Sequence, residues 1–163
     1  MDIDLRIRAM ETRDIKQLED IEGMCFLEPY SSGLWKEELN NSLSRTYVAV
    51  DNARRDLEDI VGYVNFWIVL DEAELHRLAV KETHRRRGVA CALLNFMFAS
   101  LRQTAVKTVR LEVRITNLPA ISFYDQHGFV TQGRRTGYYG RARGEDALIM
   151  ERKMEGRPGK GDA

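Results

Sequence analysis

A run of three arginines and a glycine, Arg85 to Gly88, separates an apolar segment from an amphipathic one. The first main-chain amides of a helix have no intrahelical acceptors, and the helix dipole is positive at that end. A glycine lets the backbone approach a phosphate closely, and the small Ala90 keeps the first helical turn open. The pattern therefore predicts a pyrophosphate site, although a run of charge taken alone also fits a solvent-exposed loop.

A glutamate and a tyrosine further along the chain have the chemistry to move protons. Glu112 lies on the polar face of an alternating strand, between Arg110 and Arg114, and Tyr124 follows on the next predicted helix. A carboxylate can accept a proton from a nucleophile, and a phenol can donate one to a leaving group. The same residues also fit a surface ion pair of Glu112 with its neighbours and a tyrosine packed against the sheet.

The composition is that of an ordinary soluble protein. The 163 residues, 44% hydrophobic and 31% charged, fit one domain with a core of its own. The 25 basic and 25 acidic side chains cancel, so no overall field favours a nucleic-acid partner. Cys25 and Cys91 lack metal-ligand spacing, and no apolar run reaches the roughly 18 residues of a membrane span. We therefore expect reduced thiols, no metal, no membrane contact and a cytoplasmic location.

Hydrophobic periodicity in the first half of the chain predicts a strand, two helices and an antiparallel meander. Residues 3–8 alternate as a strand, and Asp14 is expected to cap a helix. A break at residues 28–32 precedes a second helix, which carries Leu34, Trp35, Leu39 and Leu43 and has serines as N-caps. Residues 47–50, 60–70 and 74–80 read as three consecutive strands.

The second half switches to a helical period over residues 90–101 and then returns to strands. Residues 108–114 alternate as a strand, and a helix from Leu118 is expected to end at Gly128 in a left-handed conformation. Residues 129–131 and 147–154 supply the last strands. We expect residues 1–154 to form a single domain and residues 155–163 to be a flexible tail.

The arginine-glycine loop resembles the coenzyme A signature of GNAT acetyltransferases: Gln or Arg, two residues, Gly, one residue, then Gly or Ala. Further matches follow at Leu78-Ala79-Val80, Leu111 to Arg114, Asn117, Ala120, Tyr124, Gly128-Phe129, Tyr138-Tyr139 and Glu145-Asp146-Ala147, with a fainter one at Glu28-Pro29-Tyr30. Over about residues 72–150 the chain is similar to the RimI-like and archaeal Ard1-like N-terminal acetyltransferases. The resemblance implies an α/β (α+β) GNAT fold. Its central sheet is mixed, mostly antiparallel, of about seven strands, splayed at the acetyl-CoA site and flanked by about four helices.

The same resemblance implies acetyl-CoA as the donor and coenzyme A as the product. The strand at residues 78–80 would pair with the pantetheine arm, the arginine loop would hold the pyrophosphate, and an amide near Val80 would bind the acetyl carbonyl. The expected donor contacts are Leu78, Ala79, Val80, Arg85, Arg86, Arg87, Gly88, Val89, Ala90, Cys91, Asn117 and Tyr124. Asn117 stands at a predicted helix N-cap, and capping alone also explains it.

For the chemistry, the resemblance assigns Glu112 as general base and Tyr124 as general acid, in a direct attack within a ternary complex. The expected acceptor is the N-terminal amine of a protein, with ribosomal proteins among the candidates. Such an amine has a pKa of about 8 and asks less of a base than lysine at about 10.4. The expected acceptor contacts are Leu27, Glu28, Pro29, Tyr30, Glu74, His76, Tyr138 and Tyr139.

Two positions depart from the family pattern. Glu28 stands where relatives commonly have an aromatic residue, which predicts tolerance of small, polar or basic first residues, although a solvent-facing Glu28 fits equally. Glu74 stands where archaeal relatives often have a histidine, and with His76 it forms the alternative base or amine-holding pair. Two other functions stay open: acetylation of a small amine or a lysine side chain, and non-catalytic binding of acyl-CoA by a regulator.

Overall fold

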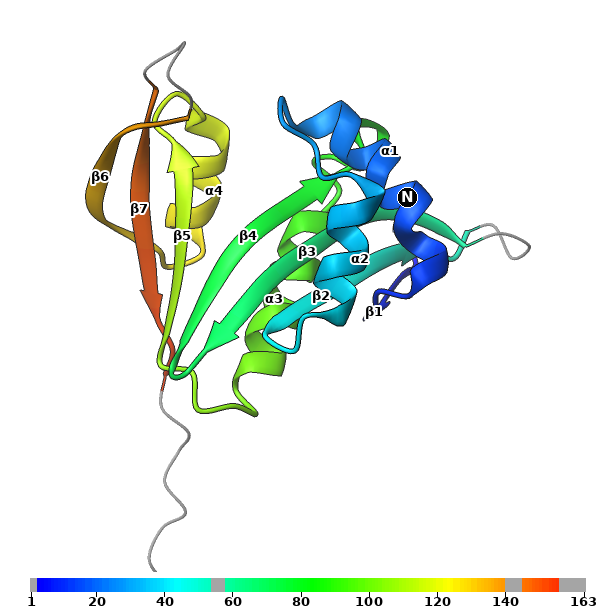
Figure 1. Cartoon of the computed structure of the whole chain (residues 1–163), viewed down its shortest axis with the longest axis horizontal. Coiled ribbons are helices and arrows are strands. Elements are labelled where there is room, and N and C mark those ends of the chain that lie inside the picture. The colour runs from blue at the N-terminus through cyan, green and yellow to red at the C-terminus, as the bar shows by residue number, and fades with distance from the viewer. Residues whose placement is uncertain (1–2, 54–57, 140–144, 156–163) are drawn as a thin grey trace, which may run out of the picture.

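The computed structural model describes residues 3–53, 58–139 and 145–155, and these form one seven-stranded sheet with helices on both faces (Figure 1). The strands are β1 Leu5–Ala9, β2 Ser44–Asp51, β3 Asp59–Val69, β4 Glu72–Val80, β5 Thr108–Arg114, β6 Val130–Tyr139 and β7 Glu145–Lys153. The helices are α1 Ile15–Cys25, α2 Ser32–Asn40, α3 Val89–Leu101 and α4 Leu118–Gln126, with short 3-10 turns at Thr12–Asp14 and Glu82–His84. The strand order is β1-β2-β3-β4-β5-β7-β6, and only β4 and β5 run parallel. The predicted mixed, mostly antiparallel sheet is confirmed.

The two central strands separate halfway along their length. β4 and β5 pair from Glu72 opposite Thr108 to Leu75 opposite Leu111, and the pairing stops there. At the next residue, His76, β4 has a bulge against β3, which increases the local twist of the strand. Figure 1 shows β4 and β5 together at one end of the sheet and wide apart at the other. The predicted splay is thus present, and main-chain groups beyond Leu75 are not bonded to β5.

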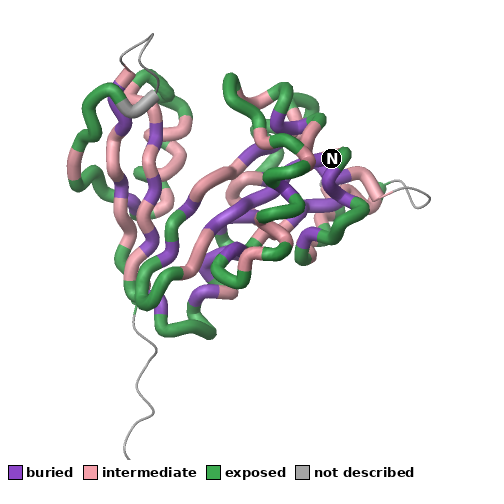
Figure 2. Tube along the Cα trace, viewed as in Figure 1, coloured by how far each residue is buried: buried purple, intermediate pink, exposed green. Residues whose placement is uncertain are grey.

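The helices bury two separate clusters, one on each face of the sheet. α3 packs on one face through Leu93, Leu94 and Met97, and α4 lies on the same side. α1 and α2 cover the other face, where Leu18 and Trp35 are completely buried. Figure 2 shows buried residues concentrated along the central strands between these layers. Because β4 and β5 separate between the layers, the opening connects the two faces of the sheet.

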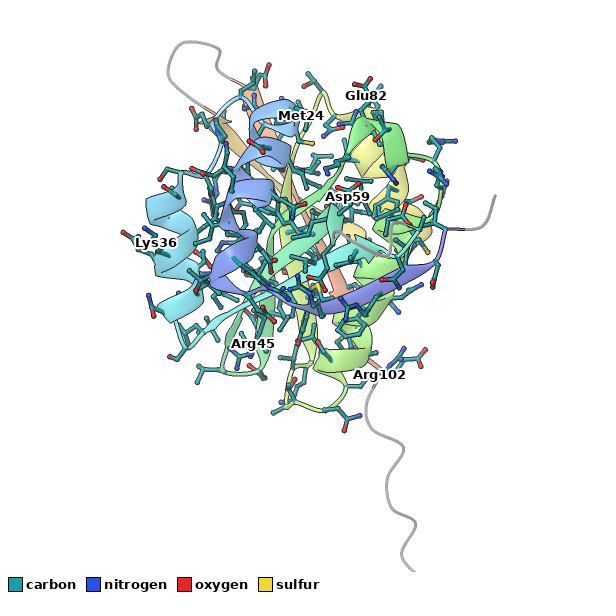
Figure 3. The ribbon with its side chains drawn as sticks, turned by 90° about the vertical axis from the view of Figure 1, so that its right-hand side faces the viewer. Met24, Lys36, Arg45, Asp59, Glu82 and Arg102 are labelled. Atoms are coloured by element: carbon teal, nitrogen blue, oxygen red, sulfur yellow. The ribbon has the colours of Figure 1, made fainter. Side chains whose placement is uncertain are left out.

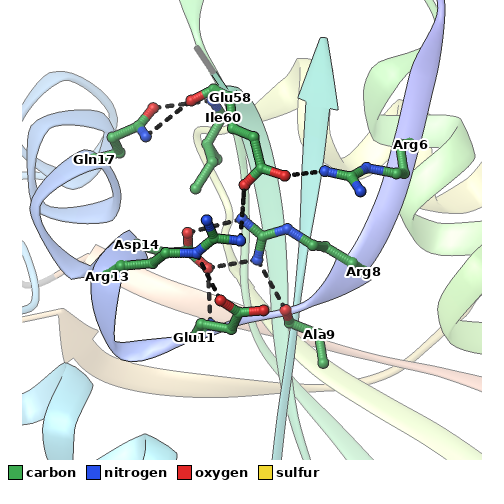
Figure 4. Close-up of polar contacts among 9 residues, drawn as sticks. All are labelled: Arg6, Arg8, Ala9, Glu11, Arg13, Asp14, Gln17, Glu58 and Ile60. Atoms are coloured by element: carbon green, nitrogen blue, oxygen red, sulfur yellow. Dashed lines mark hydrogen bonds and ion pairs between the residues drawn. The ribbon is translucent and has the colours of Figure 1, made fainter. Parts of the chain in front are cut away.

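Asp14 occupies the N-cap position of α1, as predicted, but its side chain makes no capping bond to that helix. Its carboxylate accepts the Glu11 amide at 2.7 Å and pairs with Arg8 at 2.7 Å, and Arg8 also contacts Glu58 at 2.8 Å (Figure 4). Burial opposes the ionisation of Asp14, but the bonds from Arg8 and the Glu11 amide outweigh it and lower its pKa. The carboxylate therefore ties β1 to the start of α1.

Two other boundaries differ from the sequence prediction. Ser31 caps α2 as expected, its hydroxyl accepting the Leu34 amide at 3.3 Å, but the helix ends before Leu43. β6 extends to Tyr139 through two register shifts, so the tyrosine pair ends a strand that was expected only over residues 129–131. Gly128 has a φ of 81° after α4, as predicted. The predicted tail, apart from Glu155, lies outside the described residues.

Candidate active site

A cavity of about 380 Å³ lies where β4 and β5 have separated, and we call it the acceptor cavity. Its walls come from the segment after α1, from β4, from β5 and from the start of α4. Among the predicted site residues it is lined by Leu27, Glu28, His76, Leu78, Glu112, Asn117 and Tyr124. In the side-chain view, Met24 at the end of α1 and Glu82 after β4 lie at this same open end of the molecule (Figure 3).

Glu112 lines this cavity, and one of its two carboxylate oxygens contacts an arginine while the other has no hydrogen-bond partner among the described residues. Its Oε1 atom lies 2.8 Å from a guanidinium nitrogen of Arg135 on β6. Its Oε2 atom is buried and has no hydrogen-bond partner among the described residues. The side chain is only 14% exposed, so the carboxylate is largely removed from bulk water. A buried oxygen with a free lone pair beside a cavity can accept a proton from a molecule bound there.

The neighbours of Glu112 on its own strand contact carboxylates of β7. Arg110 contacts Glu151 at 2.6 Å, and Arg114 contacts Glu145 at 2.6 Å, both across on β7. Glu151 is directly opposite Arg110 in the register of β5 and β7, and Glu145 lies two residues from Ala147, the residue opposite Arg114. The contact of Glu112 with Arg135 comes from β6.

The first turns of α4 supply the opposite wall of the acceptor cavity. Asn117 caps the helix, with its Oδ1 atom accepting the Ala120 amide at 3.3 Å, and it also lines the cavity. Tyr124 packs edge-on against Phe123 and Phe129, with ring centres 5.4 and 5.5 Å away. Glu112 and Tyr124 thus face one cavity from separate elements, as their predicted pairing requires.

Glu74 and His76, the predicted alternative base or amine-holding pair, line different cavities. His76 lines the acceptor cavity, with its ring stacked on Trp67 at 4.8 Å. Glu74 is 53% exposed and lines a smaller cavity beside Arg110 instead. Their side chains still approach to 3.4 Å. The structure therefore brings His76, but not Glu74, to the acceptor cavity.

Residues 26–31, between α1 and α2, form the outer wall, and we call them the acceptor loop. Leu27 and Glu28 are exposed and line the acceptor cavity, whereas Pro29 and Tyr30 do not line it. Tyr30 instead packs on Trp35, with ring centres 5.3 Å apart. The structure also places Cys25, Phe26, Arg77 and Arg114 in the wall, and sequence reasoning missed all four.

The predicted tyrosine pair is held at the end of β6 by a carboxylate on β7. Gly137 has a φ of 65°, and its amide donates to Asp146 at 2.9 Å. Asp146 also pairs with Arg134, and these bonds lower the pKa of its carboxyl, the Gly137 amide contributing most. The backbone of Tyr139 pairs with Glu145, but the side chains of Tyr138 and Tyr139 lie outside the described residues.

A second cavity, of about 610 Å³, lies between the arginine-glycine loop and α4, and we call it the donor cavity. Gly88 has a φ of 82° at the N-cap of α3, and Arg86 has a φ of 59°, which is unusual for a residue with a side chain. Such backbone conformations place successive amides on one concave surface that suits an anion. The amides of Val89, Ala90 and Cys91 begin α3 at this cavity. The local geometry therefore fits a pyrophosphate.

Not every predicted donor contact lines this cavity. Val80, Arg85 and Arg86 do, whereas Arg87 and the buried Ala79 line neither of the two cavities. The Arg85 side chain donates to the carbonyl of Val80 at 3.2 Å and to the Cys25 sulfur at 3.5 Å. Arg85 therefore ties the loop to the end of β4.

Helix α4 forms a wall of both cavities, and sequence reasoning missed half of it. Ala120 and Tyr124 face the acceptor cavity, and another stripe faces the donor cavity. That stripe consists of Pro119, Ser122, Phe123, Gln126 and His127. The three-and-four spacing of these residues was the available signal. The His127 ring also lies 3.4 Å from the sulfur of Cys91. An elongated donor could follow the free edge of β4 from one cavity to the other.

The described residues contain no group of three or more His, Cys, Asp or Glu placed to hold a metal ion. None of their helices has the length and apolar character needed to cross a membrane.

Known proteins resemble this chain along most of its length. The acetyltransferase (GNAT) family model matches residues 15–129. The ribosomal protein bS18-alanine N-acetyltransferase of Escherichia coli K12 is 32% identical over 147 residues, covering 88% of this chain and 94% of the relative. The crystal structure of the Escherichia coli ribosomal-protein-S18-alanine N-acetyltransferase superposes with a TM-score of 0.83 at 28% identity, covering 98% and 99% of the two chains. Arabidopsis thaliana NAA60 in complex with acetyl-CoA superposes with a TM-score of 0.84 at 26% identity, covering 93% and 99%.

Proposed function

The chain belongs to the acetyltransferase (GNAT) family, and on that basis we propose that it acetylates the N-terminal amine of a protein, with acetyl-CoA as the donor. The observation that carries this proposal is the placement of Glu112 and Tyr124 around one cavity at the open end of the sheet. The names of the Escherichia coli relatives make the N-terminal alanine of a ribosomal protein the first acceptor to test. The enzyme would act in the cytoplasm as a single domain spanning residues 1–154.

The donor would lie along the free edge of β4, with its pyrophosphate at the start of α3. The amides after Gly88 and the charge of Arg86 support the phosphate end of this path. The main chain from His76 to Val80, which β5 leaves unpaired, supports the pantetheine part. Bound acetyl-CoA would supply the acetyl thioester, and its product would be coenzyme A.

In the proposed reaction the chain's residues move two protons. Glu112 accepts a proton from the attacking amine, directly or through one water. The amine nitrogen bonds to the acetyl carbon as the carbon–sulfur bond breaks, and Tyr124 donates a proton to the departing thiolate. A phenol held beside the departing sulfur can supply this proton as a general acid. An amide of the bulged strand β4 donates to the acetyl oxygen.

The test measures thiol release from acetyl-CoA with three acceptor classes: N-terminal peptides, peptides with only a lysine amine, and polyamines. The proposal expects turnover with the first class, and loss of it in Glu112→Gln and Tyr124→Phe. Turnover restricted to lysine peptides or polyamines would identify a different acceptor. Binding of acetyl-CoA without turnover in any class would indicate a regulator.

The acceptor pocket is proposed to favour small, polar or basic first residues because Glu28 lines it. A peptide panel that varies only the first residue, assayed with wild type and Glu28→Phe, tests this idea. The proposal expects Glu28→Phe to shift the preference toward apolar first residues. An unchanged order of preference would mean that Glu28 only faces solvent.

A further inference from the structure

A fully buried carboxylate lies beneath the acceptor loop. Glu22, near the end of α1, is 0% exposed. It accepts hydrogen bonds from the Tyr63 hydroxyl on β3 and, at 2.8 Å, from the main-chain amide of Tyr30. Burial, together with the adjacent Glu22 carboxylate, raises the pKa of Tyr63 well above its usual range, so the phenol stays a proton donor. One side of the acceptor loop is thus bonded to a charge inside the protein.

Arg77 on β4 holds the same loop from the opposite side. Its guanidinium carbon lies 4.4 Å from the ring centre of Phe26 and 4.3 Å from that of Tyr30. One of its terminal nitrogens donates to the carbonyl oxygen of Glu28 at 3.1 Å. Its Nε atom lies 3.7 Å from Glu22 Oε1, so the two charges form an ion pair. A single side chain therefore contacts three residues of the loop.

From these contacts we propose that Glu22, Tyr63 and Arg77 form a latch that fixes the acceptor loop and thereby positions the peptide acceptor beside β4. The inference rests on the proposed function. None of the three side chains is assigned a chemical step. Glu22 and Tyr63 are positioning residues, because they act on the acceptor through Leu27 and Glu28, which line the acceptor cavity. Arg77 holds the same loop and also lines the cavity itself.

Stability alone is a poor explanation for this arrangement. A buried ion pair can often be replaced by apolar side chains with little loss of stability, since desolvation offsets much of the attraction. Apolar side chains could not donate to the Glu28 carbonyl or accept the Tyr30 amide. Arg77 also follows directly after the bulge at His76. The latch therefore connects the acceptor loop to the strand that carries the proposed acetyl site.

The latch should govern the acceptor and leave the donor unaffected. The donor cavity is lined by Val80, by the loop and helix start that follow it and by α4, and none of the latch side chains lines it. The proposed donor path uses the main chain of Arg77 and not its side chain. The start of α2 has its own anchor, since the Ser32 amide donates to Glu19 at 2.7 Å. Loss of the latch would therefore free the middle of the loop while both helices keep their positions.

The main experiment compares Arg77→Met with Arg110→Met. Both replace a strand arginine that pairs with a carboxylate, but Arg110 pairs with Glu151, away from the acceptor cavity. We expect Arg77→Met to raise KM for an N-terminal peptide about tenfold or more, and to change Kd for acetyl-CoA less than about twofold. Arg77→Lys, which keeps the charge, should recover part of the loss. An unchanged peptide KM in folded Arg77→Met would overturn the latch.

Native-state hydrogen exchange gives an independent readout that needs no turnover. The amide of Tyr30 should be protected in the wild type and should exchange at least about tenfold faster in Glu22→Gln, which keeps the shape of the side chain. A Tyr30 amide that exchanges freely in the wild type would overturn the latch even if every variant fails to fold. Wild-type activity confined to lysine peptides or polyamines would instead contradict the proposed function and leave the exchange result valid.

Discussion

Arg135 holds Glu112 by one oxygen: the two side chains meet at 2.8 Å through Oε1, while Oε2 is buried without a partner among the described residues. The contact crosses two strand boundaries, because β7 lies between β5 and β6. A carboxylate fixed in this way has one orientation and one available acceptor, which is the requirement for a positioned base.

Replacing Glu112 should remove the base without disturbing the fold. We expect Glu112→Gln to lower kcat with an N-terminal peptide about 10²–10⁴-fold, the usual contribution of general base catalysis. Thiol release at saturating acetyl-CoA measures the effect. Glu151→Gln, which removes a β5–β7 ion-pair partner outside the acceptor cavity, is the control and should keep kcat within about twofold of wild type. Equal rates in the two variants would rule out Glu112 as the base.

Replacing Arg135 should leave the Glu112 carboxylate present but no longer held in one orientation. We expect Arg135→Met to lower kcat about tenfold and to leave KM for acetyl-CoA unchanged, because the carboxylate would sample orientations that do not face the amine. Steady-state kinetics with varied donor and varied peptide separate the two constants. If kcat stays at the wild-type value while Glu112→Gln is inactive, Arg135 has no positioning role.

The energetic cost of the left-handed backbone at Gly88, in the arginine-glycine loop, can be measured by making the same substitution, glycine to alanine, at Gly88 and at Gly23. A Cβ atom at Gly88 or at Gly23 would meet nothing within 4 Å, so neither substitution causes a steric clash. Gly88→Ala must keep a φ near 82° and should destabilise the protein by about 1–2 kcal/mol. Gly23→Ala lies in helix α1 and should stabilise it by about 0.5–1 kcal/mol. Urea unfolding compares the two variants.

The same pair of variants also tests the donor site. Gly88→Ala should weaken acetyl-CoA binding about tenfold, since the amides that follow residue 88 would shift, whereas Gly23→Ala should bind as the wild type does. Calorimetric titration measures both. Equal affinity in the two variants would show that the backbone conformation at Gly88 is not needed for the donor.

Acid should weaken the tie between β1 and α1. The pKa of Asp14 is lowered below 3.8, so the fold favours its ionised form. This stabilisation is complete above about pH 3.8 and is lost as the pH falls toward the folded-state pKa. Asp14→Asn should therefore lower the free energy of unfolding at pH 7 by about 1–3 kcal/mol, because Arg8 keeps its charge without its buried partner.

The decisive measurement is how the difference in free energy of unfolding between wild type and Asp14→Asn changes with pH. The gap between wild type and Asp14→Asn, from urea unfolding, should narrow below about pH 3.8. Asp20→Asn removes an exposed partner of Lys16 and should differ little from wild type at any pH. A gap for Asp14→Asn that stays constant down to pH 2 would contradict the assigned role of the Arg8–Asp14 pair.

The features that depend on neighbours along the chain could be predicted from local sequence patterns. The helix over 89–101, the left-handed Gly128 and the capping roles of Ser31 and Asn117 follow from local periodicity and turn chemistry. The arginine-glycine loop could likewise be predicted from the sequence, because the start of any helix has main-chain amides without intrahelical acceptors. Strand ends were less predictable, and β6 continues to Tyr139 because Asp146 supports the turn at Gly137.

Only the tertiary structure decided which distant residues meet. Glu112 was expected to have Arg110 and Arg114 beside it, but the order β5-β7-β6 gives those arginines to β7 and brings Arg135 to Glu112. β4 and β5 separate after Leu75, where β4 has its bulge at His76, and beyond that point His76 lines the acceptor cavity and Arg77 contacts the acceptor loop. Such contacts join segments tens of residues apart, and their geometry depends on strand order and register, which local sequence patterns do not encode.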